Sequence, residues 1–194
     1  MKHRAASVVV PVIGAVAAAG LLTGCGSSGP SADGSGASTP ASGAASSTAS
    51  SSAQPVVQPC DAIDTAKLES VLGYAMSKNT GTKSNPSCVL TPAVRGGAVF
   101  QLNYQWWFKG GLAASWKTMS KSISGKATTV TVPGADDARV VVNSTKKADY
   151  VTGFVENDAL VQVVDAEALP KDAARLKRAV LEALAELSAG APKS

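Results

Sequence analysis

The sequence predicts an α+β fold: an antiparallel β-sheet packed with a short N-terminal helix, a middle helix and a C-terminal helix, with one disulfide. The segment 98–108 alternates apolar and polar residues with the period of two that a half-buried strand requires. The segments 112–123 and 170–190 instead carry apolar residues at helical spacing. Along the chain the patterns follow in the order helix, strands, helix, strands, helix, which favours helices packed on an antiparallel sheet.

The first 25 residues indicate an export signal. A basic head at residues 2–4 precedes the apolar run 8–22, which is shorter than the roughly 20 residues of a membrane-spanning helix. The run ends in Leu22-Thr23-Gly24-Cys25, which resembles the bacterial lipobox. The lipobox implies cleavage before Cys25 and a diacylglycerol on its sulfur, and two acyl chains anchor a protein stably. We therefore expect export and lipid anchoring to the outer face of the cell membrane. The alternative is a free cysteine near an ordinary cleavage site.

Composition divides the rest of the chain into three parts. Residues 26–58 are almost entirely Ser, Gly, Ala, Thr and Pro, which cannot bury enough apolar surface to fold, so a disordered tether is expected. A single globular α+β domain is expected over 59–190, and a flexible tail over 191–194. Loss of Lys2 and Arg4 with the signal leaves 16 basic against 14 acidic residues. That charge density is too low for a nucleic-acid-binding surface.

Two cysteines, Cys60 and Cys88, remain in the expected domain. In the oxidising compartment of an exported chain two thiols usually pair, so a disulfide between them is predicted. The alternative is a two-thiolate metal site, but the single histidine, His3, leaves with the signal. In the chain-entropy model, closing a loop of about 29 residues would stabilise the fold by about 3.5 kcal/mol.

The domain opens with a short helix and a strand. Asp64 is expected to cap the helix and Gly73 to end it, while Ile63 and Leu68 form a hydrophobic staple. A polar loop, 74–87, then leads to Cys88. The strand that follows has one core-facing row: Ala98, Phe100, Leu102, Tyr104, Trp106 and Phe108.

The second half of the domain again combines helices and strands. Helix 112–123 follows Gly110-Gly111. Strands are expected at 128–132, 138–143, 150–156 and 160–164, the last two joined as a hairpin through Asn157-Asp158. The terminal helix runs from Pro170 to Gly190. Its buried stripe is Leu176, Val180, Leu184 and Leu187.

Several short motifs resemble a known family. They are "PCDAIDTAKLESVLG", a second cysteine about 28 residues later, "VPGADDA" at 132–138, paired strands and an Ala/Leu-rich final helix. Over most of 59–187 the chain is similar to actinobacterial lipoproteins grouped as domain of unknown function 3558. Val89-Leu90 stand where that family has an aromatic residue, and Ala135-Asp136 replace its Leu-Gly. The resemblance implies an envelope location, a disulfide and a helix-flanked sheet, and it carries no activity.

The residues do not indicate an enzyme. With no histidine after the signal, the usual Ser-His, Cys-His and His-metal arrangements are absent. The carboxylate pair Asp136-Asp137 follows Pro133-Gly134 and is expected on a solvated turn, not facing one substrate as acid/base catalysis requires. We therefore expect no catalytic residue, no metal and no cofactor.

Gln105, Trp107 and Trp116 are the candidate binding residues. Trp107 alternates away from the core-facing row, beside Gln105, where a rigid aromatic ring could stack on a sugar or anchor a partner. The alternative is that a helix covers this face. For Trp116, which belongs to a helical apolar stripe, burial is the stronger expectation.

A basic row on the terminal helix is a further candidate. Lys171, Arg175 and Arg178 lie at helical spacing and could contact anionic lipid or wall polymer. Glu182 follows Arg178 by four residues, which favours an ordinary solvated face.

The pattern as a whole predicts a membrane-anchored surface lipoprotein that acts as a non-catalytic binding or interaction module in the bacterial cell envelope. Its partner would be an envelope protein, a glycan or a small ligand, and not a nucleic acid. The alternative is a carrier that holds a small apolar or glycan ligand between sheet and helix. A closed apolar cavity beside Trp106 or Trp116 would favour the carrier, and an exposed Trp107 over a filled core would favour a protein or polysaccharide partner.

Overall fold

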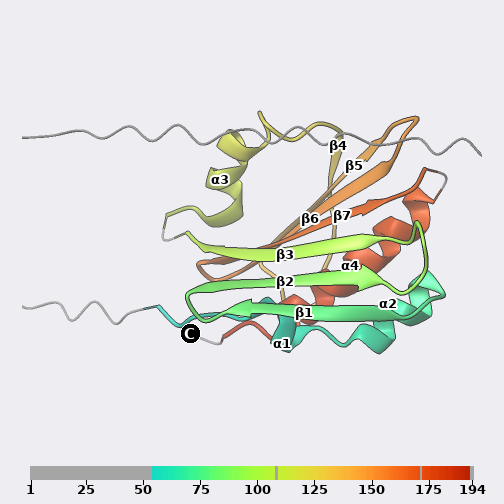
Figure 1. Ribbon diagram of the computed structural model, residues 1–194. Coiled ribbons are helices and arrows are strands. Elements are labelled where there is room, and N and C mark those ends of the chain that lie inside the picture. Colours follow the sequence, from blue (N-terminus) through green and yellow to red (C-terminus); the bar gives the residue numbers. More distant parts are fainter. Residues whose placement is uncertain (1–53, 108, 171, 193–194) are drawn as a thin grey trace, which may run out of the picture. The chain divides into compact units, whose positions relative to one another are not determined.

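The computed structural model describes residues 54–107, 109–170 and 172–192 (Figure 1). Within them, seven antiparallel strands form one sheet that carries four helices, so the predicted α+β class is confirmed. The signal, the lipobox with Cys25 and the stretch 26–53 lie outside the described residues, as do Phe108 and Lys171. No helix in the described part is long and apolar enough to cross a membrane.

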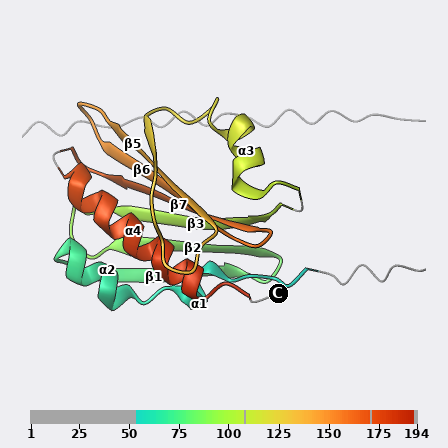
Figure 2. The same ribbon diagram turned by 180° about the vertical axis from the view of Figure 1, so that it is seen from behind.

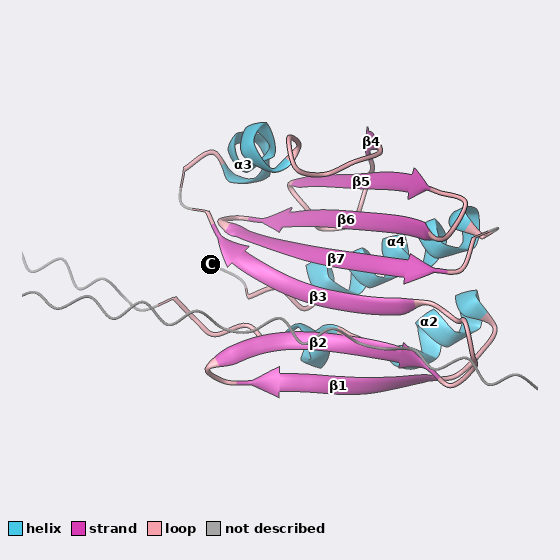
Figure 3. Ribbon diagram, turned by 45° about the horizontal axis from the view of Figure 1, so that its top comes forward, coloured by secondary structure: helices cyan, strands magenta, loops and turns pink. Residues whose placement is uncertain are grey.

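The elements follow one another as α1 (Pro59–Ala62), α2 (Thr65–Leu72), β1 (Met76–Thr82), β2 (Asn85–Pro92), β3 (Val99–Trp106), α3 (Gly111–Met119), β4 (Lys126–Thr129), β5 (Asp137–Ser144), β6 (Asp149–Asn157), β7 (Leu160–Ala168) and α4 (Ala173–Ala189). The strands are ordered β1-β2-β3-β7-β6-β5-β4 across the sheet, as Figure 3 shows. The pairing of β3 with β7 therefore joins strands that are far apart in the sequence.

The predicted cap and stop of the first long helix, α2, are confirmed. The Asp64 carboxylate accepts a hydrogen bond from the backbone N–H of Ala66 at 3.0 Å. Gly73 ends the helix with φ of 82°, a left-handed conformation that suits glycine. Both members of the staple, Ile63 and Leu68, are buried. The four-residue helix α1, which starts at Pro59, was not predicted.

The polar loop predicted over 74–87 is wrong. That segment forms β1 and the start of β2, paired as an antiparallel hairpin. β1 is an edge strand in which only Met76 is buried, so its backbone hydrogen bonds to β2, and not an apolar row, hold it in the sheet. A period-two search for apolar residues does not detect a strand whose side chains are polar on both faces.

The other predicted elements exist with shifted ends. The strand predicted at 128–132 is β4, which is shorter and ends at Thr129. β7 runs four residues past the predicted end to Ala168 and pairs with β3 and β6 over that stretch. α3 stops at Met119 and not at residue 123, and α4 starts at Ala173 and not at Pro170.

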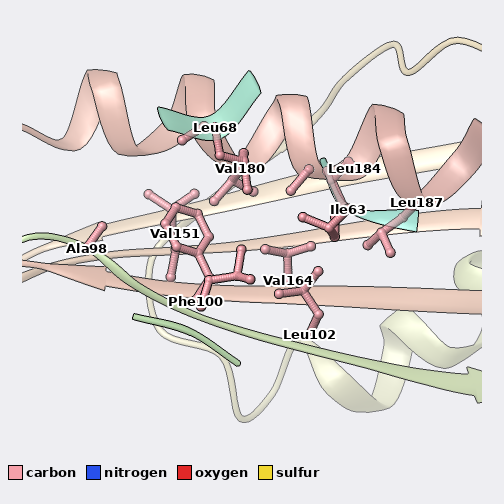
Figure 4. Packing of buried hydrophobic residues seen from close by; sticks show 14 of the residues in the cluster. Ile63, Leu68, Ala98, Phe100, Leu102, Val151, Val164, Val180, Leu184 and Leu187 are labelled. Atoms are coloured by element: carbon pink, nitrogen blue, oxygen red, sulfur yellow. The ribbon is translucent and has the colours of Figure 1, made fainter. Parts of the chain in front are cut away.

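The main core lies between α4 and one face of the sheet (Figure 4). The predicted stripe of α4 is confirmed, because Leu176, Val180, Leu184 and Leu187 are all buried. Against them lie large side chains of β3 such as Phe100 and Leu102. Close approach is possible at Gly153 of β6, where an added Cβ would lie 2.6 Å from a Val180 methyl carbon. Viewed from behind, α4 crosses this face on the same side as α1 and α2 (Figure 2).

The predicted disulfide is confirmed. Cys60 of α1 is bonded to Cys88 of β2, with 4.9 Å between their Cα atoms. Both cysteines are fully buried in the main core. The disulfide therefore fastens the first helix to the second strand of the sheet.

Candidate functional site on the second face of the sheet

The face of the sheet opposite α4 is only partly covered, and it holds the candidate site. Two rows of side chains cross it in register. The first is Gln101, Asp165, Thr152 and Val141, and the second is Asn103, Val163, Phe154 and Arg139. α3 covers one part of this face through a small apolar cluster of Leu112, Val141, Phe154 and Val161. Polar side chains of β3, β6 and β7 stay at the surface beside it.

A carboxylate from the sheet holds the start of α3. The chain enters this helix through Gly110 and Gly111, both with positive φ. The Glu156 carboxylate of β6 accepts a hydrogen bond from the backbone N–H of Leu112 at 3.0 Å. The cap residue Gly110 has no side chain to do this, so Glu156 satisfies an N–H that the helix itself leaves free. A Cβ on Gly111 would lie 1.4 Å from a Glu156 carboxylate oxygen, so this contact requires glycine.

Trp116 fixes the middle of α3 to the sheet. Its ring meets Phe154 edge to face, with 5.4 Å between the ring centroids. The guanidinium carbon of Arg139 lies 4.9 Å from the Trp116 ring centroid, a cation–π arrangement. Arg139 is also paired with Asp137 at 2.7 Å. The packing of Trp116 is thus the helical-stripe arrangement expected for it.

Trp107 lies just after β3 and is half-buried. Its backbone N–H donates to the carbonyl of Ala159 at 2.6 Å, and its indole Nε1 donates to Gln105 Oε1 at 3.3 Å. The ring packs against the apolar cluster under α3. Trp107 is therefore covered in part by this cluster, whereas Gln105 stays exposed.

A surface groove of about 380 Å³ runs along the sheet beside α3. We call it the α3 groove, and its lining residues used below are Asn103, Gln105, Thr152, Phe154, Asp165 and Met119. A smaller hollow of about 180 Å³ shares Thr152 and Asp165 with it and extends to Gln101, Tyr150 and Glu167. The two hollows together form one continuous polar strip across β3, β7 and β6.

The strip is rich in hydrogen-bonding groups. Thr152 Oγ1 donates to Asp165 Oδ1 at 2.7 Å, which holds that carboxylate in place. The side-chain amides of Gln101 and Asn103 have no hydrogen-bond partner among the described residues, so both donors and acceptors face solvent. The negative charge of Glu167 raises the pKa of the exposed Tyr150 phenol.

The Asp136-Asp137 pair and the basic residues of α4 lie elsewhere in the described part. Asp136 Oδ2 accepts from the backbone N–H of Asp158 at 2.7 Å, while Asp137, the first residue of β5, is paired with Arg139. The predicted turn therefore holds for Asp136 and not for Asp137. On α4, Arg175 is paired with Asp172 and donates to the carbonyl of Leu72 at 3.2 Å. No group of His, Cys, Asp and Glu residues in the described ranges is arranged to hold a metal ion.

No protein-family model, curated protein or solved structure matches this chain. The similarity to the domain of unknown function 3558 lipoproteins therefore stays a prediction. Alternation along β3 already placed Gln101, Asn103 and Gln105 on the second face. The contributions of Thr152 and Asp165 were missed, because they depend on strand register and on the part of β7 beyond its predicted end.

Proposed function

We propose that this protein is a lipid-anchored lipoprotein of the bacterial cell envelope whose domain is a non-catalytic binding module for a neutral glycan. The anchor in this proposal is the diacylglycerol on Cys25, supported by the lipobox sequence. The binding surface is the α3 groove. One observation carries the assignment: exposed amides and a carboxylate line a surface groove whose walls also include apolar side chains.

The chemistry of the groove suits hydroxyl groups. Primary amides both donate and accept, and carboxylates accept from sugar hydroxyls. Half-buried Tyr104, Met119 and Ile123 add apolar surface to the lining. These are the few placed polar groups among apolar walls that orient a small ligand.

Charge favours a neutral ligand over an anionic one. Asp165 and Glu167 form no ion pair with any residue in the described ranges. Arg139, a cation that strand register places on this face of the sheet, is already paired with Asp137. An anionic polymer would therefore meet uncompensated negative charge along the strip.

A carrier of a short glycan is the second candidate, although the α3 groove is open to the surface and is not the closed apolar cavity that would favour a carrier. The α3 groove lies between the sheet and a helix, and its volume of about 380 Å³ falls within the usual range for small-ligand sites. The module and the carrier would use the same residues. They differ in the length of ligand that they hold.

Binding is tested with the chain from residue 25 onward, made without lipid as Cys25→Ser, and neutral N-acetylhexosamine oligosaccharides of increasing length. Calorimetry should show binding that Asn103→Ala with Gln105→Ala weakens at least about tenfold, the loss of two hydrogen bonds. Asn79→Ala, an exposed amide on the edge strand β1, is the matched control and should bind as the wild type.

Three outcomes decide between the binding module and the carrier. Affinity that rises with oligosaccharide length supports the module, and affinity that is constant beyond a disaccharide supports the carrier. Absence of binding, or equal loss in the Asn79→Ala control, contradicts both. The anchor is tested separately, since Cys25→Ala in the full chain should move the protein from the membrane fraction to the soluble fraction.

A further inference from the structure

Three connections meet at one end of the sheet. They are the β2–β3 loop with Val94 to Gly97, the β5–β6 turn with Lys146 and Lys147, and the β7–α4 connection with Leu169. Figures 1 and 3 show them together at the end opposite to the one where residue 54 enters the domain. Gly96, Lys147 and Leu169 line one surface hollow of about 310 Å³, which places the three connections in contact.

This end exposes apolar side chains. Leu169 is 62% exposed and Val94 is 45% exposed, although both belong to a class of residue that is usually covered. Leu169 lies over Gly96, where an added Cβ would come within 2.6 Å of its Cδ1 atom. The two aliphatic side chains therefore project from neighbouring connections.

Three cations lie on two of the same connections. Arg95, Lys146 and Lys147 are all exposed, and none forms an ion pair with a described residue. The turn that presents the lysines is well fixed, because Thr145 Oγ1 accepts from the backbone N–H groups of Lys147 and Ala148 and donates to the Ala148 carbonyl.

Acidic residues near this end offset part of this charge. Asp149 is buried and accepts from the backbone N–H of Asp172 at 3.0 Å, while the Asp172 carboxylate is paired with Arg175. Glu167 lines the hollow beside Lys147 and interacts with Tyr150. We define the sheet tip as Val94, Arg95, Lys146, Lys147 and Leu169, a surface with three cations and two exposed aliphatic side chains.

We propose that the sheet tip is a membrane-contact surface that binds the headgroup region of a bilayer containing anionic lipid. Cations near such a surface each raise partitioning about fivefold, and aliphatic side chains among them enter the headgroup layer. This surface is distinct from the α3 groove and does not depend on the glycan proposal. In an anchored protein, even a weak contact of this kind becomes an intramolecular one and would fix the orientation of the domain.

The test is co-sedimentation of the chain from residue 25 (Cys25→Ser) with vesicles of phosphatidylcholine alone or mixed with phosphatidylglycerol. The wild type should bind the mixed vesicles, and added salt should weaken this binding. Lys146→Glu with Lys147→Glu should lower the partition coefficient at least about tenfold. Lys117→Glu with Lys121→Glu changes the net charge equally on the exposed side of α3 and just beyond it, and should leave binding within about twofold.

A third pair of variants separates a membrane from an anionic polymer. Val94→Ser with Leu169→Ser should also weaken vesicle binding, because a bilayer takes up the apolar side chains. If this pair binds as the wild type while the lysine pair does not, the surface takes phosphate groups alone and the membrane proposal is overturned. It is equally overturned if the wild type does not bind the mixed vesicles, or if the α3 control loses as much as the lysine pair. Unchanged thermal unfolding of each variant shows that the fold is intact.

Discussion

Glu186 is the least expected residue of the core, because it is a carboxylate on α4 that is only 5% exposed. It accepts a hydrogen bond from the backbone N–H of Asp64 at 3.2 Å, and Lys67 Nζ lies 3.3 Å from its other oxygen. These contacts join the start of α2 to the end of α4. Burial outweighs them and raises the pKa of the Glu186 carboxyl.

The raised pKa gives a signed pH dependence of stability. The folded state holds this proton more tightly than the unfolded chain, so the contribution of Glu186 is fully present below about pH 4.3, the ordinary glutamate pKa. It is lost as pH rises through the higher folded-state pKa. Urea unfolding across this range should show the stability of wild type relative to Glu186→Gln falling as pH rises. Glu182→Gln on the same helix is the matched control, and identical pH profiles for wild type and Glu186→Gln would contradict the prediction.

For single residues, contacts between neighbours in the sequence were predictable, and contacts between residues far apart in the sequence were not. Asp64 caps α2 through an N–H two residues away, and the residue types alone indicate this. Glu156 caps α3 from 44 residues away, on another element. Nothing near Gly110-Gly111 in the sequence identifies that partner, since the contact exists only once β6 is in the sheet.

Among the elements, α3 is held on the sheet by a small apolar cluster and by the Glu156 contact at its start, and Gly111 lies at that contact. Gly111→Ala would force the Glu156 carboxylate away from Leu112 and place alanine at φ of 47°. We expect the fold to lose about 1–2 kcal/mol, through the lost cap and the strained backbone. Hydrogen exchange should accelerate at amides 112–119 and stay slow in α4.

Glu156→Gln supplies the control for that variant. Glutamine can still accept from the Leu112 N–H, so α3 should exchange only slightly faster than in the wild type. Slow exchange of α3 in Gly111→Ala would show that the helix does not depend on this cap.

Elements with an apolar period were predictable, and those without one were not. β3 alternates clearly, the β6–β7 hairpin has apolar runs joined by turn residues, and the α4 stripe has helical spacing. β1 has polar side chains on both faces, and its hydrogen bonds to β2, not apolar burial, hold it in the sheet. The far end of β7 alternates alanine with Asp165 and Glu167, a pattern too weakly apolar to indicate a strand.

For the whole molecule, the Cys60–Cys88 disulfide is the covalent link between the N-terminal helix and the sheet. Cys60→Ala with Cys88→Ala should lower the free energy of unfolding by about 3.5 kcal/mol, because the unfolded chain regains the entropy of a loop with a sequence separation of 28. Urea denaturation measures the difference. The wild type in reductant should approach the variant, and equal midpoints for oxidised wild type and variant would contradict the prediction.

The architecture was predictable to the level of its layers, but the arrangement that makes the groove was not. Alternation identifies two faces for β3, yet only the pairing of β3 with β7 brings Asn103 and Asp165 onto one surface. That pairing joins strands separated by α3, β4, β5 and β6. Neither the choice of β7 as the partner of β3 nor the register between them can be predicted from the sequence of one segment.

The position of α4 in the chain has a consequence for the timing of folding. The apolar face of the sheet is covered by this helix, which follows all seven strands in the sequence. Strand β3 likewise gains its second neighbouring strand only after β7 has been synthesised. During synthesis the core therefore cannot close until α4 has left the ribosome. A nascent chain whose core closes so late stays unfolded for longer and can pass through a narrow channel. The export proposed from its first 25 residues requires this.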